Sequence, residues 1–143
     1  MTGFEGISID HLGIAVRSLA EALPFYQALL FPSEPKDAEI IPAEQVRVVM
    51  LPVLGSRIEL LEPLAPDSVV GRFLDKRGPG LHHVAFRVPD LAAAAGRLKQ
   101  AGAKLLSEPK KGAGGHSYVF VHPASSGGVL IELIQEMTQE QGS

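Results

Sequence analysis

Two stretches of the sequence resemble each other, and this internal repeat constrains the fold more than any other feature. Residues 9–16 read Ile-Asp-His-Leu-Gly-Ile-Ala-Val, and residues 81–88 read Leu-His-His-Val-Ala-Phe-Arg-Val. Aligning His11 with His83 pairs further residues: Val16 with Val88, Leu19 with Leu91, and Ala20 and Ala22 with Ala92 and Ala94. A motif that recurs in this way predicts one supersecondary unit used twice.

The repeat continues downstream in a second pair of segments. Residues 58–61 read Ile-Glu-Leu-Leu, and residues 131–134 read Ile-Glu-Leu-Ile. Glu59 and Glu132 follow their histidines at spacings that differ by one residue. Each half therefore begins with a strand that carries His and ends with a strand that carries Glu.

Hydrophobic periodicity and turn residues predict the elements of each half. In the first half we expect strands at 7–16, 46–53 and 57–61, an irregular or edge strand within 32–45, and a helix from an N-cap at Ser18 to about Leu30, which Pro24 delays or kinks. In the second half we expect strands at 81–88, 103–107, 116–121 and 129–134, and a helix at 91–101 between Asp90 and Gly102. A short helix at 68–77, capped by Asp67, joins the halves. Each half is then β-α-β-β-β.

Neither module buries both faces of its strands alone, so we expect an α+β fold in which the two pair into a curved sheet around a metal site. With 143 residues the chain forms a single domain. Its predicted parts are module 1 at about 7–64, the linker helix at about 67–77, module 2 at about 80–135, and a tail at 136–143.

Composition narrows the classes of function. The chain is 45% hydrophobic and 20% charged, which is typical of a globular protein rather than a disordered one. Its apolar runs are too short to cross a membrane. A net charge of −3 without a basic stripe argues against a nucleic-acid partner. The first residues do not resemble a signal peptide and Cys is absent, so we expect a cytoplasmic location and no thiol chemistry.

The two His and two Glu of the repeat form a candidate metal-ligand set: His11, Glu59, His83 and Glu132. Imidazole and carboxylate suit Zn, Co, Ni, Mn or Fe(II), and four ligands leave positions open for water or substrate in an octahedral shell. Packing the modules about a pseudo-twofold axis would bring equivalent residues together. The alternative is structural, because a single His on a strand often serves packing alone. Glu132 favours the metal, since an apolar run surrounds it and burying an unpartnered carboxylate is costly.

Other polar residues fit the pattern less well. By alternation His82 points away from the face of His83, so we assign it a supporting role. His116 and His122 have no repeat mate and are expected in loops or on the surface. The glycine-rich segment 112–115 resembles a phosphate-binding loop, and Lys110 and Lys111 precede it. We therefore expect Lys110, Lys111, Gly114 and Gly115 to bind an anionic part of a substrate.

These motifs resemble the vicinal-oxygen-chelate superfamily of glyoxalases, extradiol dioxygenases and fosfomycin-resistance proteins. More narrowly, the chain is similar to the methylmalonyl-CoA epimerase family over about residues 7–135. The matching segments are 10–16, 58–63, 73–83, 112–115 and 122–133.

The resemblance implies that the family's metal ligands fall on His11, Glu59, His83 and Glu132, with Co, Mn, Zn or Ni as the divalent ion. It implies an isomerase that interconverts the two epimers of methylmalonyl-CoA, or of a similar acyl-CoA, through an enolate that the metal stabilises. Inversion needs two acid/base groups, and Glu132 is the candidate for one of them. The resemblance and the exposed outer faces of such sheets also predict a homodimer.

The sequence departs from the family at two places. Some members carry a carboxylate in the strand that here reads Val-Arg-Val-Val at residues 46–49. This leaves Glu44 or a metal-bound water as the second acid/base group. Ala124 stands where a Lys is common in similar sequences.

The same scaffold serves other functions, because fold does not determine function. A glyoxalase I-type isomerase (a lactoylglutathione lyase), or another metal-dependent enzyme of the superfamily such as a ring-cleaving dioxygenase, is one alternative. A small-molecule-binding resistance protein without enzymatic activity is another, although its relatives often lack the metal ligands.

Overall fold

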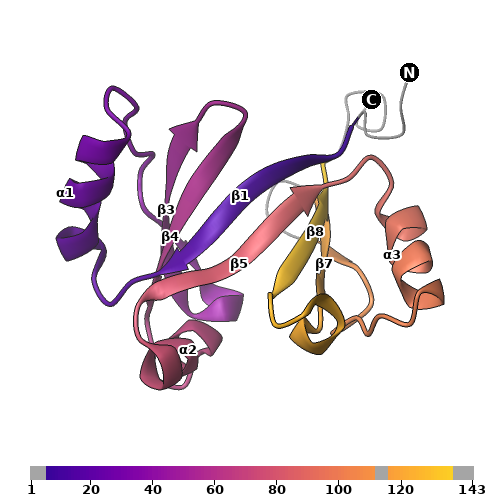
Figure 1. Ribbon diagram of the computed structural model, residues 1–143. Helices are drawn as coiled ribbons and strands as arrows, with labels where there is room; N and C mark the ends of the chain where they lie inside the picture. The colour runs from indigo at the N-terminus through magenta and orange to yellow at the C-terminus, as the bar shows by residue number, and fades with distance from the viewer. Residues whose placement is uncertain (1–5, 112–115, 137–143) are drawn as a thin grey trace. The chain divides into compact units, whose positions relative to one another are not determined.

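The computed structural model describes residues 6–111 and 116–136, which divide into two compact units (Figure 1). We call residues 11–82 the first unit, and residues 1–10 together with 83–143 the second unit. This division does not test the prediction of a single domain with modules at about 7–64 and 80–135, which stays a prediction. Among the described residues no helix is both long and apolar enough to cross a membrane.

The first unit contains a four-stranded arrangement flanked by two helices. Its elements are β1 (Ser8–Ala15, which begins in the second unit), α1 (Leu19–Leu29), β2 (Glu39–Ile41), a 3-10 turn (Pro42–Glu44), β3 (Val46–Val53), β4 (Ser56–Pro63) and α2 (Val69–Arg77). The strand order is β2-β3-β4-β1. β4 pairs antiparallel with β3 and parallel with β1, and β2 pairs antiparallel with β3 at the edge. This is the predicted hairpin with the predicted edge strand.

Alternation along these strands separates two apolar clusters. Under α1 lie the buried residues Val16, Leu19, Val49, Leu51 and Leu60, with Ile14 and Leu23 packed against them. On the opposite face α2 covers Ala15, Val46, Val48 and Leu61 through Val70 and Leu74. The face covered by α2 is the one on which His11, Gly13 and Ala15 were predicted to lie, so α2 closes one end of that face.

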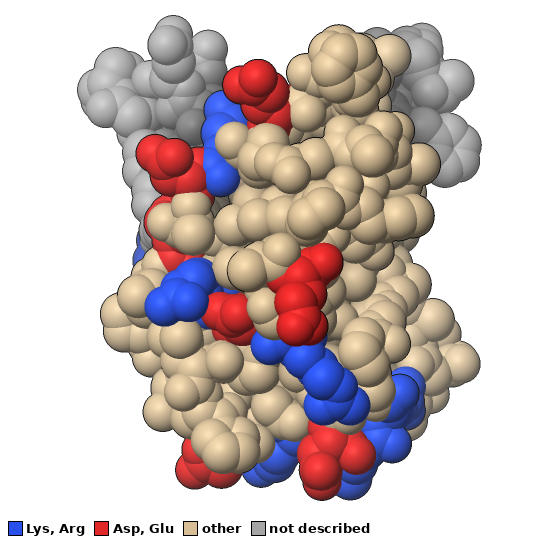
Figure 2. Space-filling view, turned by 90° about the vertical axis from the view of Figure 1, so that its left-hand side faces the viewer, with Lys and Arg blue, Asp and Glu red and all other residues tan. Residues whose placement is uncertain are grey.

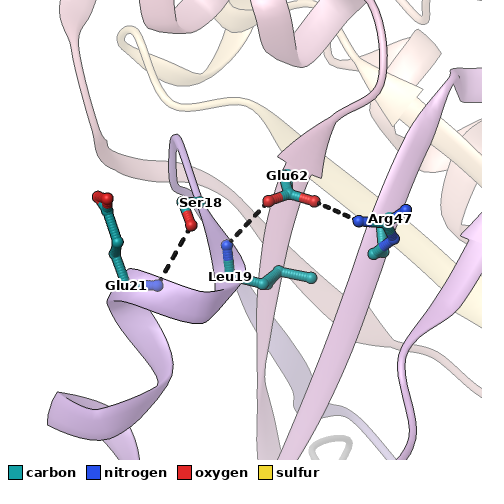
Figure 3. A network of polar contacts seen from close by, with 5 residues as sticks. All are labelled: Ser18, Leu19, Glu21, Arg47 and Glu62. Atoms are coloured by element: carbon teal, nitrogen blue, oxygen red, sulfur yellow. Dashed lines mark hydrogen bonds and ion pairs between the residues drawn. The ribbon is translucent and has the colours of Figure 1, made fainter.

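Two polar side chains, Ser18 and Glu62, accept hydrogen bonds from backbone amides at the N-terminus of α1 (Figure 3). The Ser18 hydroxyl accepts a hydrogen bond from the Glu21 amide at 3.2 Å, as the sequence predicted. The Glu62 carboxylate, on β4, accepts one from the Leu19 amide at 3.0 Å and another from the Arg47 guanidinium at 2.9 Å. Pro24 lies inside the helix, which nonetheless begins at Leu19, so the expected late start is wrong. These contacts satisfy donors that a helix leaves unpaired at its first turn.

The second unit repeats the plan with one helix on its sheet. Its elements are β5 (Gly80–Arg87, which begins in the first unit), α3 (Leu91–Gln100), β6 (Lys110–Lys111), β7 (Ser117–Val121), a 3-10 turn (Pro123–Ser126) and β8 (Ile131–Gln135), in the strand order β5-β8-β7-β6. α3 covers Val88, Leu91, Ala94, Val119 and Leu133. The predicted β-α-β-β-β plan is thus present in both halves.

Three local predictions need correction. Residues 103–107 form no strand, because Leu105 alone bridges Val121 and the short strand β6 takes the next place beside β7. α2 is capped by Ser68, whose hydroxyl accepts from the Gly71 amide at 3.0 Å, and not by Asp67. The C-cap of α3 is Ala101 and not the predicted Gly102, which follows at φ +92°, whereas Asp90 is its N-cap as predicted. The glycine-rich segment 112–115 and the tail from residue 137 lie outside the described residues.

The side of the molecule that carries α1 has broad areas without acidic or basic residues (Figure 2). Large apolar side chains are exposed on this helix and just beyond it: Phe25 is 64% exposed, Leu29 62% and Phe31 82%. A surface of this kind is often an interface with another protein.

Candidate functional site

The buried His11 and the part-buried Glu59 form a pair in the first unit. Gly13, two residues after His11 on β1, is the register partner of Glu59 on β4. The side chains of His11 and Glu59 therefore project from the same face of the sheet. The Nε2 atom of His11 lies 3.5 Å from Oε1 of Glu59, and the side chains are 6% and 15% exposed. Ala15, on the same face as His11, is fully buried in the apolar cluster that α2 covers.

His83 and Glu132 form the equivalent pair in the second unit. Ala85, two residues after His83 on β5, is the register partner of Glu132 on β8. The Nε2 atom of His83 lies 3.4 Å from Oε1 of Glu132. Both residues are buried, at 5% and 8% exposure. The repeat thus places a His and a Glu side by side twice, by the same parallel strand pairing.

A large side chain lies across from each carboxylate. In the antiparallel ladder Met50 is opposite Glu59, and Phe120 is opposite Glu132. The ring of Phe120 also meets the His83 imidazole edge-on, with centroids 5.9 Å apart. Sequence reasoning missed both neighbours, because their place depends on the strand register, which the repeat of His and Glu does not specify.

Asp10 and Arg87 form a further, part-buried contact in the second unit. Asp10 is fully buried, and one of its carboxylate oxygens accepts hydrogen bonds from Nε of Arg87 at 3.1 Å and from Nη2 at 2.6 Å. This bond to Asp10 raises the pKa of Arg87 above its usual value. Asp10 directly precedes His11, so the contact holds the strand at the residue before a candidate ligand. An Asp inside an apolar strand was the signal that could have revealed it.

The remaining histidines lie outside these pairs. His82 packs edge-on against Phe73 of α2, with centroids 5.0 Å apart, and burial lowers the pKa of His82. His122 accepts a hydrogen bond from the Ala124 amide at its Nδ1 atom and so begins a 3-10 turn. His116 lies near Tyr118 in the chain segment before β7. These positions agree with the supporting and surface roles expected for them.

The predicted anion-binding residues are only partly described. Lys110 and Lys111 form the exposed edge strand β6, where they pair with Tyr118 and Ser117. Gly114 and Gly115 lie outside the described residues. The prediction that these four residues bind substrate is therefore not tested.

Comparison with known proteins identifies the relatives of this chain. The sequence profile of the glyoxalase/bleomycin resistance protein/dioxygenase superfamily matches residues 10–120. The ethylmalonyl-CoA/methylmalonyl-CoA epimerase of Cereibacter sphaeroides is 39% identical over 132 residues, which cover 89% of this chain and 96% of the relative.

Solved structures agree with this result. The crystal structure of methylmalonyl-CoA epimerase from Mycobacterium tuberculosis superposes with a TM-score of 0.86 at 36% identity, covering 100% of this chain and 97% of the other. A methylmalonyl-CoA epimerase in complex with methylmalonyl-CoA and ammonium superposes with a TM-score of 0.81 at 38% identity, covering 90% and 93%. The predicted glyoxalase-like fold is confirmed. The chain belongs to the glyoxalase/bleomycin resistance protein/dioxygenase superfamily and, within it, to the family of the methylmalonyl-CoA epimerases.

Proposed function

We propose that this protein is a methylmalonyl-CoA epimerase, an isomerase that interconverts the two epimers of an acyl-CoA at its α-carbon. The observation that carries this proposal is the His–Glu pair present in each half, at 3.5 Å and 3.4 Å, in a chain related over most of its length to epimerases of this name. The relatives named above are epimerases, which favours this function over the glyoxalase and binding-protein alternatives.

The donor set fits a divalent metal. Two atoms that each lie about 2.1 Å from one ion are about 3.0 Å apart at an octahedral angle and about 3.4 Å apart at a tetrahedral one, close to the separation within each pair. His11, His83 and Glu132 are buried donors of types that could hold a metal ion. We propose that these three and Glu59 bind one ion of Co, Mn, Zn or Ni. When bound, such an ion supplies Lewis-acid stabilisation of the negative charge on an enolate.

Glu132 is the side chain that we propose to move the proton. It is 8% exposed, and its neighbours Leu133 and Ile134 are also buried, so water has little access to it. A carboxylate here could remove the α-proton of one epimer, and it could donate a proton to the same face of the enolate that forms from the other epimer. This role is additional to its role as a ligand.

The opposite face of the α-carbon needs a second acid/base group. Strand β3 offers none, because Arg47 is its only ionisable residue and its guanidinium donates to Glu62. We propose to test Glu44 as the second acid/base group. Its carboxylate belongs to the first unit, at the end of the 3-10 turn before β3.

We propose that the CoA arm binds along β6, through the exposed Lys110 and Lys111. CoA carries phosphate groups, and lysine is a common phosphate ligand in proteins. Gly114 and Gly115 belong to the same proposal. The predicted cytoplasmic location stays a prediction.

Deuterium exchange at the α-carbon tests the proposed activity. The metal-loaded protein is incubated in D₂O with each epimer of methylmalonyl-CoA separately, and deuterium incorporation and epimer composition are followed by mass spectrometry and NMR. We expect exchange and epimerisation from both epimers. The hemithioacetal of methylglyoxal and glutathione serves as the control substrate. Turnover of this compound, without exchange in methylmalonyl-CoA, would assign the protein to the glyoxalases instead.

We also propose a homodimer, supported by the exposed Phe25, Leu29 and Phe31. Light scattering on the purified protein should give about twice the chain mass of 15.2 kDa. The double variant Phe25→Ser/Phe31→Ser should move the mass toward the monomer if this patch is the interface. Leu54→Ser, which alters a fully exposed residue of the β3–β4 turn, is the control. A wild-type protein that is monomeric at all accessible concentrations would refute the dimer.

A further inference from the structure

Met50 lies on the same face of the first unit as the candidate ligands His11 and Glu59. It is the register partner of Glu59 in the antiparallel β3–β4 ladder, so the two side chains are direct neighbours. Its environment differs from that of the residues on either side. Val49 and Leu51 point to the other face and are buried under α1. Met50 is only half-buried and belongs to none of the apolar clusters of the described residues.

A cavity of about 200 Å³ opens in front of Met50. Its residues are Lys36, Asp37, Glu39, Val48, Met50, Pro52 and Arg57. Strand register explains the composition, since Pro52 is opposite Arg57 and Val48 is opposite Glu39. Val48, Met50 and Pro52 of β3 therefore form an apolar wall of the cavity. The other lining residues are charged: Lys36, Asp37, Glu39 and Arg57.

The packing of α2 explains why the part of this wall formed by Met50 and Pro52 stays open. α2 covers Val46 and Val48 at the start of β3 and Leu61 on β4. Met50 and Pro52 lie further along β3, beyond the residues that α2 contacts. A half-buried Met beside the part-buried Glu59 carboxylate is thus available to contact a ligand. Its unbranched, flexible side chain adapts to the shape of an apolar group.

We infer that Met50 contacts the alkyl substituent on the α-carbon of the acyl-CoA and sets which substituent the enzyme prefers. This inference rests on the proposed function, because an acyl group bound to an ion that Glu59 helps to hold would bring its substituent close to the residue beside Glu59. The substituent is a small alkyl group, such as the methyl of methylmalonyl-CoA or the ethyl of ethylmalonyl-CoA. A single methylene in an apolar pocket changes kcat/KM by about 10- to 200-fold, so one side chain can determine the preference.

Variants that change the size of residue 50 test the inference. The readout is the ratio of kcat/KM for ethylmalonyl-CoA to kcat/KM for methylmalonyl-CoA, measured on metal-loaded protein. We expect Met50→Ala to raise this ratio about 10-fold and Met50→Phe to lower it about 10-fold, the lower scale for one methylene. Met50→Leu, which nearly conserves volume, should keep the wild-type ratio. Met50→Val replaces Met50→Ala if the alanine variant does not fold.

Controls separate a substrate contact from a general effect. Leu54→Ala alters a residue that is fully exposed in the turn after β3 and should leave the ratio unchanged. Metal content and circular dichroism should match the wild type in every variant. A ratio that stays at the wild-type value in both the smaller and the larger variant overturns the role of Met50, and so does an equal loss toward both substrates. Wild-type protein that exchanges neither substrate refutes the proposed function itself, a result that the Met50 variants do not influence.

Discussion

Glu62 and Gln135 hold equivalent positions in the two halves, and each accepts a hydrogen bond from the first backbone amide of its helix. The Glu62 carboxylate lies 3.0 Å from the Leu19 nitrogen, and the Gln135 amide oxygen lies 2.7 Å from the Leu91 nitrogen. Each residue is three positions after the Glu of its pair. The strand that presents a candidate ligand therefore also fixes the start of the helix that covers its opposite face.

This relationship predicts a stability change on substitution of Glu62. Glu62→Ala should lower the free energy of unfolding by about 0.5–2 kcal/mol, as loss of a capping side chain usually does. Glu62→Gln keeps an acceptor for Leu19 and loses only the charged pair with the partly exposed Arg47, so it should cost about 0–1 kcal/mol. Urea unfolding measures both. An alanine variant no less stable than the glutamine variant would contradict the capping role.

Removing Arg87 should destabilise the second unit. Arg87→Leu deprives the fully buried Asp10 of two hydrogen bonds, and we expect a loss of about 1–3 kcal/mol. Arg97→Leu on the exposed surface of α3 is the matched control and should change stability by less than about 0.5 kcal/mol. Equal thermal midpoints for the two variants would show that the Asp10 contact does not stabilise the fold.

The two adjacent histidines of β5 should differ in their effect on metal binding. His83→Ala should lose the metal and the activity, because it removes a proposed ligand. His82→Ala should keep the metal, because His82 packs against Phe73 instead. Metal content of the purified variants, measured by mass spectrometry, decides between them. Equal loss from both would mean that the wrong histidine was assigned.

A crystal structure with bound metal should place all four proposed ligands around one ion. We expect a nitrogen of His11 and of His83, and a carboxylate oxygen of Glu59 and of Glu132, at about 2.0–2.2 Å from the ion. If any of the four residues points away from the ion, the proposal that all four are ligands is wrong.

Glu132→Gln should separate metal binding from proton transfer. The amide oxygen can still bind a metal weakly but cannot accept a proton, so turnover should fall by at least about 100-fold. The decisive measurement is the exchange of the α-proton into D₂O from each epimer separately.

The outcome of that exchange experiment assigns the acid/base groups. If the variant retains metal and exchanges both epimers at the wild-type rate, Glu132 is a ligand only. Exchange of one epimer alone would show that a second group acts on the opposite face. Glu44→Gln, measured in the same way, then tests whether that group is Glu44.

Much of the fold could be predicted because it depends on local signals. Ser18 and Asp90 cap their helices as expected, since a side-chain oxygen three residues before a free amide needs no distant partner. Local signals do not determine the strands at the edge of the sheet. The strand expected at 103–107 is absent, because pairing of an edge segment depends on its neighbour and not on its own apolar residues.

By itself the sequence determined the repeated β-α-β-β-β plan and the presence of one strand with His and one strand with Glu in each half. Both follow from period-two alternation and from the same spacing used twice, which are properties of the chain alone. Only the tertiary structure decided that Met50 stands beside Glu59, that Phe120 stands beside His83, and that Arg87 holds Asp10. These neighbours come from different strands, and a shift of one residue in register would turn each side chain to the other face.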